Sequence, residues 1–179
     1  LFDYEVRKDS GYHRILIDGA GSRSHQGAPD LPLISALLEV PAEAGIGLQL
    51  LQVTGDERIH FIPAPIVDYS EHLEPGEQPA ERAIVSQITE DQLSAVSLGT
   101  AAILRDRRVV QISFAPCQII PQTEELEIAS RIEVLVSFHG NDFSNSGPLV
   151  SRPVTADWSE LYHNLVLNNS AGSRELHAP

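Results

Sequence analysis

Several residue types are rare or missing in this sequence, and each absence narrows the kinds of protein it can be. Its 179 residues include no methionine, not even at position 1, so we expect a processed or excised part of a longer protein. The single cysteine, Cys117, has no second cysteine with which to form an internal disulfide bond. No stretch reaches the roughly 18 consecutive apolar residues of a membrane-spanning helix. Disulfide-stapled scaffolds and helical membrane spans are therefore excluded for this sequence.

Positive charge is also scarce, with 12 basic residues against 25 acidic ones and a formal net charge of −13. A surface of this sign repels phosphate backbones and anionic membranes, so we expect no nucleic-acid partner and no membrane span. It would associate faster with a basic protein or a cationic groove. The simpler alternative is that the acidity serves solubility alone.

What the sequence does contain is a series of short β-branched or aliphatic runs separated by Gly, Pro, Asn and Asp. This pattern predicts an all-β protein, namely an antiparallel β-sandwich of jelly-roll-like type. Gly45 is expected to form a hairpin between the second and third runs, and Thr54-Gly55-Asp56 is expected to be a turn. The predicted strands cover residues 12–19, 31–41, 46–53, 57–65, 108–120 and 126–140.

Two short helices are predicted in addition, one internal and one near the C-terminus. The first covers residues 88–99, with capping-box spacing at its start and Gly99 at its end. Before it, residues 68–82 are predicted to form an exposed loop. The second covers residues 155–169, where Thr155 is a candidate N-cap and apolar residues recur at helical spacing. We therefore divide the chain into a β-sandwich, 1–154, and a C-terminal helix with a linker, 155–179.

Cys117 and His139 are the candidates for a cysteine nucleophile and its base. In caspase-like peptidases a hydrophobic strand ends in His-Gly, and the catalytic cysteine follows downstream. Here "VLVSFHG" has the first half of that pattern, but Cys117 precedes His139 by 22 positions. We therefore expect no catalytic residue in this chain, and we expect Cys117 to be a small buried apolar residue.

Metal and cofactor motifs are missing from the sequence as well. The seven histidines are scattered, and there is no H-E-x-x-H, G-x-S-x-G or glycine-rich phosphate loop. We accordingly predict no metal site and no cofactor.

Arg105, Arg107 and Arg108 form the single basic cluster on this acidic background. As structure, they fit a solvated turn between two strands, where charge discourages edge-to-edge aggregation. As function, an arginine on a tight turn can enter a carboxylate-lined pocket, because its guanidinium pairs bidentately with an acid. Both interpretations stay open at this point.

Two blocks of the sequence resemble the propeptides of gingipain-type cysteine peptidases. "GAPDLPLISALLEVP" is similar to their early Gly-x-Pro-x-Leu-Pro block with its following strand. "LRDRRVVQISFAPCQIIPQTEELEIASRIEVLVSF" resembles their later block, with Pro116, Pro121 and Leu126 at the expected places. The final "LYHNLVLNN" is similar to the helix at the junction with the catalytic domain. The resemblance covers about residues 12–169.

This resemblance implies the N-terminal prodomain of a secreted bacterial zymogen, which is not an enzyme by itself. It would inhibit the catalytic domain and assist its folding, and that domain, of Arg- or Lys-specific type, would be the partner and follow this chain. Arg105, Arg107 and Arg108 are the candidates to plug the specificity pocket, and Arg174 and Arg23 are the candidate processing sites. The competing hypothesis is a carbohydrate-binding or adhesive β-sandwich module, which would need more exposed aromatic residues than this chain offers.

Overall fold

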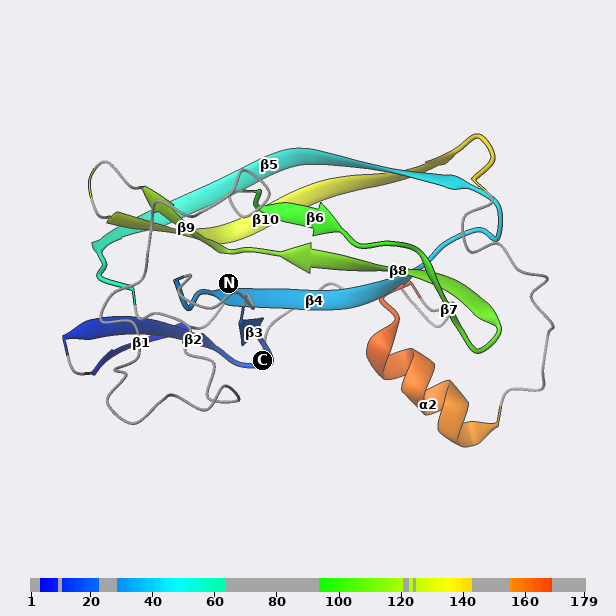
Figure 1. Cartoon of the computed structure of the whole chain (residues 1–179), viewed down its shortest axis with the longest axis horizontal. Helices are drawn as coiled ribbons and strands as arrows, with labels where there is room; N and C mark the ends of the chain where they lie inside the picture. Colours follow the sequence, from blue (N-terminus) through cyan, green and yellow to red (C-terminus); the bar gives the residue numbers. More distant parts are fainter. Residues whose placement is uncertain are drawn as a thin grey trace, which may run out of the picture.

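The computed structural model describes residues 4–9, 11–22, 29–63, 94–120, 123, 125–142 and 155–168. Figure 1 shows extended β-strands arranged in layers, with a helix packed at one end. The elements are Tyr4–Asp9 (β1), Tyr12–Ile17 (β2), Gly21–Ser22 (β3), Pro32–Glu39 (β4), Gly45–His60 (β5), Val96–Leu98 (β6), Ala102–Leu104 (β7), Arg107–Phe114 (β8), Cys117–Ile120 (β9), Glu125–His139 (β10) and Ala156–Leu165 (α2).

The strands form two larger antiparallel sheets and one separate hairpin. One sheet has the order β5-β10-β9, and the other has the order β3-β4-β8-β6 with β7 also paired to β8. The hairpin joins β1 and β2. The predicted all-β antiparallel class with a C-terminal helix is confirmed.

The predicted strand 108–120 is divided into two strands that belong to different sheets. It breaks at Ala115 and Pro116, between β8 and β9. Proline has no N–H to donate to a ladder, so the break falls where a donor is missing. The Ala115 N–H donates to Ala95 O at 2.9 Å, and Pro116 O accepts from the Ala129 N–H at 2.7 Å. One continuous stretch of chain thus fastens the two sheets together.

Two turns expected around β5 are absent, and those expectations were wrong. The residues before and after Gly45 do not pair as a hairpin, because β4 belongs to the sheet of β8 whereas β5 pairs with β10. Gly45 instead allows close approach, since an added Cβ would lie 2.9 Å from His139 O. Thr54-Gly55-Asp56 lies within continuous β5, at a register irregularity opposite Ala129. A bulge keeps a strand going where a turn would end it.

The internal helix predicted over 88–99 does not reach Gly99. Val96–Leu98 is β6, which pairs with Phe114, Ser113 and Ile112 of β8, and the Gly99 N–H continues this ladder to Gln111 O at 2.8 Å. Pairing with a long neighbouring strand has overridden the local helical signal. Residues 88–93 and the expected loop 68–82 lie outside the described residues.

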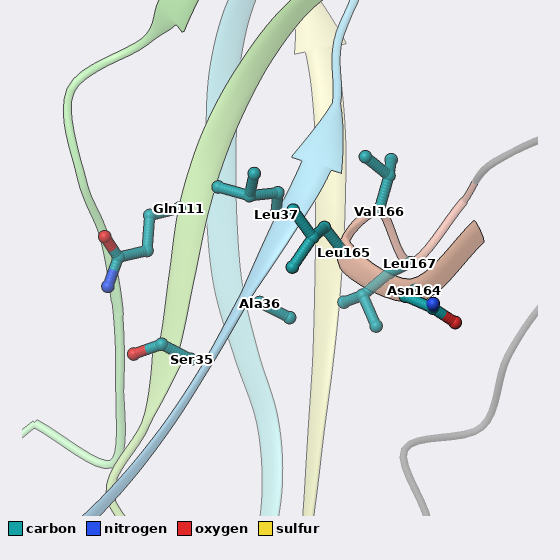
Figure 2. Close-up of a pocket in the computed structure, with 8 residues that line it drawn as sticks. All are labelled: Ser35, Ala36, Leu37, Gln111, Asn164, Leu165, Val166 and Leu167. Atoms are coloured by element: carbon teal, nitrogen blue, oxygen red, sulfur yellow. The ribbon is translucent and has the colours of Figure 1, made fainter. Parts of the chain in front are cut away.

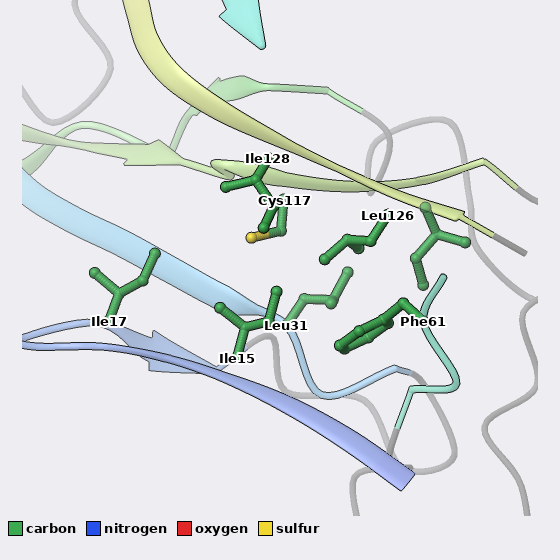
Figure 3. Close-up of a cluster of buried hydrophobic side chains, with 8 residues drawn as sticks. Ile15, Ile17, Leu31, Phe61, Cys117, Leu126 and Ile128 are labelled. Atoms are coloured by element: carbon green, nitrogen blue, oxygen red, sulfur yellow. The ribbon is translucent and has the colours of Figure 1, made fainter. Parts of the chain in front are cut away.

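The main hydrophobic cluster lies beneath β9 and the start of β10 (Figure 3). Cys117 is 2% exposed within it, as the sequence predicted for a structural cysteine. The cluster joins the β2 hairpin strand to the sheet of β5, β10 and β9, and it consists of Ile15, Ile17, Leu31, Phe61, Cys117, Ile119, Leu126 and Ile128.

Arg108 lies at the opposite end of β8 and is completely buried. Its guanidinium donates to Pro41 O at 2.9 Å and Ala44 O at 2.7 Å, both in the connection from β4 to β5. It also pairs with Asp142 Oδ2 at 3.0 Å, just beyond β10. One side chain therefore holds the β4–β5 connection and the end of β10 against β8. Arg108, one of the three arginines of the basic cluster, therefore has a structural role as an anchor.

The β1–β2 hairpin is attached to the end of β5 through His13. The His13 N–H donates to Ile62 O at 2.7 Å, and the Ile62 N–H donates to His13 Nδ1 at 3.0 Å. The ring stacks on Phe61, with centroids 5.7 Å apart. Because Nδ1 accepts a hydrogen bond, it must be unprotonated in this arrangement.

Replacement of Arg108 by Met should destabilise the domain by about 2 to 4 kcal/mol, because two carbonyl oxygens and Asp142 lose their donor. The matched control is Arg131→Met, whose ion pair with Glu133 is largely exposed, at 71% and 36%. That control should cost no more than about 0.5 kcal/mol. Urea unfolding of both variants measures the difference, and equal free energies of unfolding would contradict the anchoring role.

Acidification should weaken the attachment of the hairpin. The pKa of His13 lies below its ordinary 6.5, because burial, then Lys8 and His60, disfavour the charged ring. The unfolded chain therefore takes up the proton first as pH falls. The contribution of His13 to stability should be fully present above about pH 6.5 and lost as pH falls through the lower folded pKa.

The measurement is the free energy of unfolding against pH for the parent and for His13→Asn, which keeps an acceptor near the Nδ1 position but does not titrate. Part of the loss of stability below pH 6.5 should disappear in the variant. Superimposable pH profiles would show that His13 is not the sensitive group.

Candidate functional site

The basic cluster lies on the tight turn between β7 and β8. Leu104 pairs with Arg107, so Arg105 and Asp106 form the turn. Arg105 has a φ of 59°, the left-handed region that side chains other than glycine rarely occupy. Such a conformation costs on the order of 1 kcal/mol or more and persists only when surrounding contacts hold it.

Those contacts come from helix α2. The guanidinium of Arg105 lies over Trp158, 4.9 Å from the ring centroid, and that of Arg107 lies over Tyr162 at 4.1 Å. The two rings are 5.7 Å apart, one helical turn from each other. Such cation–π contacts stabilise by roughly 0.5 to 2 kcal/mol, depending on how far the groups are shielded from water. We call Arg105, Asp106, Arg107, Trp158 and Tyr162 the arginine–aromatic cluster.

Hydrogen bonds and an ion pair complete this cluster. The hydroxyl of the fully buried Tyr162 donates to Asp106 Oδ1 at 2.6 Å. Burial, followed by this bond to a carboxylate, raises the pKa of Tyr162, so the phenol remains a neutral donor. Arg107 pairs with Glu39 Oε2 at 2.7 Å. The turn is thus bonded to both α2 and the end of β4.

Helix α2 continues into a segment that runs along β4. Val166 bridges to Leu37 in parallel, and the Leu167 N–H donates to Leu37 O at 2.8 Å. The Asn168 amide then bonds both the N–H and the C=O of Glu39, each at 2.8 Å. The helix predicted over 155–169 is confirmed with closer bounds, although Thr155, at the N-cap position, makes no side-chain capping bond.

A hollow of about 380 Å³ lies between the end of α2 and the sheet of β4 and β8 (Figure 2). Its walls are mostly aliphatic, with the amide of Gln111 and the hydroxyl of Ser35 on the strand side. The lining residues are Ser35, Ala36, Leu37, Gln111, Asn164, Leu165, Val166 and Leu167. A site of this kind can accept an apolar side chain, and it holds no paired acid and base.

The structure separates the three candidate arginines. Arg105 and Arg107 are partly exposed at the turn, whereas Arg108 is buried and bonded as described above. In this conformation the guanidinium of Arg108 does not reach a partner's surface. The proposed processing sites, Arg23 and Arg174, lie outside the described residues.

Cys117 and His139 are far apart, as the order of the motif suggested. Cys117 is opposite Ile128 on β10, and His139 is at the far end of the same strand. Eleven residues of strand at about 3.3 Å each place them roughly 35 Å apart. His139 therefore cannot act as a base for this thiol.

Sequence reasoning missed the partners of the arginines. Trp158 and Tyr162 are among the apolar residues that recur at helical spacing over residues 155–169. No local pattern points to Asp106, Glu39 or Asp142 as partners of the arginines. The available signal was that Trp158 and Tyr162 lie one helical turn apart. Two arginines on a β-turn, such as Arg105 and Arg107, can stack on such a pair. The carboxylates lie too far away in sequence for a local pattern to pair them.

Within the described part of the chain, no group of three or more His, Cys, Asp or Glu side chains is placed to hold a metal ion. In the same part of the chain, no helix is long and apolar enough to span a membrane.

Comparisons of sequence and of structure with known proteins point to the same group of relatives. The family model Propeptide_C25 matches residues 2–147. Gingipain R2 of Porphyromonas gingivalis is 26% identical over an alignment of 153 residues, and this alignment covers 83% of this chain and 20% of that protein. The chain thus spans about a fifth of the length of the curated relatives it matches.

Solved structures share the fold. The complex of the P. gingivalis RgpB pro- and mature domains matches with a TM-score of 0.62 and 20% identity, covering 93% of this chain and 86% of that one. A structure on zymogenic latency of gingipain K, from the same organism, matches with a TM-score of 0.53 and 16% identity, covering 76% and 80%. The family match extends over most of the chain and agrees with the sequence resemblance. The chain therefore belongs to the Propeptide_C25 family and is a non-catalytic propeptide of a peptidase precursor.

Proposed function

We propose that this domain binds the catalytic domain of its own precursor, keeps it latent and assists its folding. The observation that carries the proposal is the family match over residues 2–147. The likeness of the fold to a prodomain solved in complex with its mature domain supports it. The resemblance further implies an exported bacterial peptidase that cleaves after Arg or Lys.

An arginine of the propeptide is the proposed plug of the specificity pocket, and Arg105 is the best placed of the three candidates. It occupies the tip of the β7–β8 turn, where a protruding hairpin can enter a cleft. It stacks on Trp158, which is itself partly exposed, and it also bonds Tyr162, so it would have to leave both rings of α2 to enter a pocket.

Arg107 and Arg108 fit the plug less well because neither lies at the tip of the turn and each is paired with a carboxylate of another segment. Arg107 would have to leave Glu39 and the ring of Tyr162. Arg108 would have to leave two carbonyl oxygens and Asp142 from a fully buried position. Their proposed role is to hold the turn that presents Arg105. Cleavage at Arg174 or Arg23 remains the proposed processing step.

The test adds the chain to the mature catalytic domain of its own precursor and measures the inhibition constant with a short arginine substrate. Arg105→Ala should raise that constant at least roughly tenfold, since a charged side chain in a specificity pocket is a typical hot spot. Arg105→Lys should retain part of the inhibition because the charge is kept.

Arg7→Ala is the matched control, because Arg7 is an exposed arginine on the β1–β2 hairpin, outside the turn of Arg105. It should inhibit like the parent. If Arg105→Ala also inhibits like the parent, the assignment of Arg105 is wrong while the propeptide function stands. If the parent chain neither inhibits the mature domain nor improves its yield of active enzyme on refolding, the proposed function itself fails.

A further inference from the structure

The long ribbon of β5 and β10 has apolar side chains that the rest of the described chain leaves uncovered. We call residues 45–54 of β5 and 131–139 of β10 the distal ribbon. Five large hydrophobic residues in it are more than two-fifths exposed: Leu50 42%, Leu51 54%, Val53 41%, Leu135 50% and Phe138 44%. Large apolar side chains that are exposed together, unlike single scattered ones, commonly mark an interaction site.

The exposed side chains fall on both faces of the distal ribbon. Leu50 is opposite Val134 and Phe138 is opposite Ile46, so these residues share the face that is partly covered. Leu135 is opposite Gln49 and therefore projects from the other face. Leu51 is the extra residue at the register shift beside Glu133 and Val134. A bulge of this kind re-aims the side chain that it carries.

Charge distribution distinguishes the distal ribbon from the rest of the protein. Residues 45–54 contain no charged side chain, and residues 131–139 contain Arg131 and Glu133, which pair with each other. One positive and one negative charge cancel, whereas the whole chain carries −13. The cores of protein interfaces are depleted in charge in the same way. A solvated face of this acidic domain would be expected to carry acidic residues instead.

The edges of the ribbon are open as well. Strand β9 pairs only with Glu125–Ile128 of β10, and no strand in the described residues pairs with the other edge of residues 131–139. Open edges present unpaired backbone groups to which another chain can add a strand or a loop.

The position of the distal ribbon near the last described residue favours a domain tethered to this chain as its occupant. Asn168, the last described residue, is bonded to Glu39. Six residues further along the chain from Glu39 is Gly45, where the ribbon begins, so the two points lie within about 20 Å. Eleven more residues follow Asn168 in the sequence and can span at most about 40 Å. A catalytic domain tethered through them would stay within reach of the distal ribbon, which raises its effective concentration there.

We propose that the distal ribbon is the surface on which the catalytic domain of the same precursor docks, with Leu51 and Leu135 at the centre of the contact. This inference rests on the proposed function, and it adds a second contact region separate from the arginine–aromatic cluster. The apolar ribbon would supply binding energy, and the turn of Arg105 would reach the specificity pocket.

Direct binding of the chain to the mature catalytic domain of its precursor tests this proposal. The double variant Leu51→Ser/Leu135→Ser should weaken the dissociation constant at least roughly tenfold. The control is Val6→Ser/Leu16→Ser, which removes side chains of similar exposure, 42% and 39%, from the β1–β2 hairpin. That control should bind within about twofold of the parent, and both variants should keep the parent's thermal unfolding temperature to within a few degrees.

A second measurement uses the single, buried cysteine of the chain. Leu135→Cys introduces one accessible thiol, to which a photoactivated cross-linker can be attached. It should cross-link to the catalytic domain, whereas the same label at Val6→Cys should not.

The outcomes separate the two proposals. If the parent chain does not bind the catalytic domain, the proposed function fails and this inference falls with it. If the parent binds and the ribbon variant binds equally well, the docking surface alone is wrong. It is also wrong if both double variants lose binding, or if the ribbon variant abolishes a dimer of this chain and leaves binding to the catalytic domain unchanged.

Discussion

The buried guanidinium of Arg108 is the interaction on which the arrangement of the two sheets depends. It joins β8, in one sheet, to the connection that enters β5 and to the end of β10, in the other. A buried charge is tolerated only when its bonds are made, so the β4–β5 connection and Asp142 must occupy these places together. The Asp142 N–H, which bonds Glu43 O at 2.7 Å, closes the same junction through the backbone.

The neighbouring arginines extend this junction toward the C-terminal helix. Arg107 contacts Glu39 at the end of β4 and Tyr162 of α2, and Arg105 contacts Trp158 of α2. Together with Arg108, they link the β7–β8 turn to the β4–β5 connection, the end of β4 and the helix. The turn that carries them therefore has its shape set from two sides. A turn held in this way loses little conformational entropy when it binds a partner.

Alternating apolar residues were enough to predict the class and most of the strands, such as 12–19 and 126–140, because period-two burial is a local property. They could not predict which strands pair. The break at Pro116 and the bulge at Gly55 depend on the neighbouring strand, and both were first assigned incorrectly. At the candidate site, the sequence identified the arginines but not their partners, since Glu39 is 68 positions from Arg107 and Asp106 is 56 positions from Tyr162. Nor does an arginine's own sequence signal reveal that it is buried.

The segment from Val166 to Asn168 lies along the edge of β4 where β3 no longer pairs with it. It acts as a cover over backbone groups that would otherwise be free to join another sheet. A cut in the chain after this segment would leave the cover in place. A cut before this segment would separate it from the domain and leave the edge of β4 uncovered, and such an edge promotes aggregation. The position of a cut relative to Val166–Asn168 would thus decide whether the separated domain keeps the edge of β4 covered.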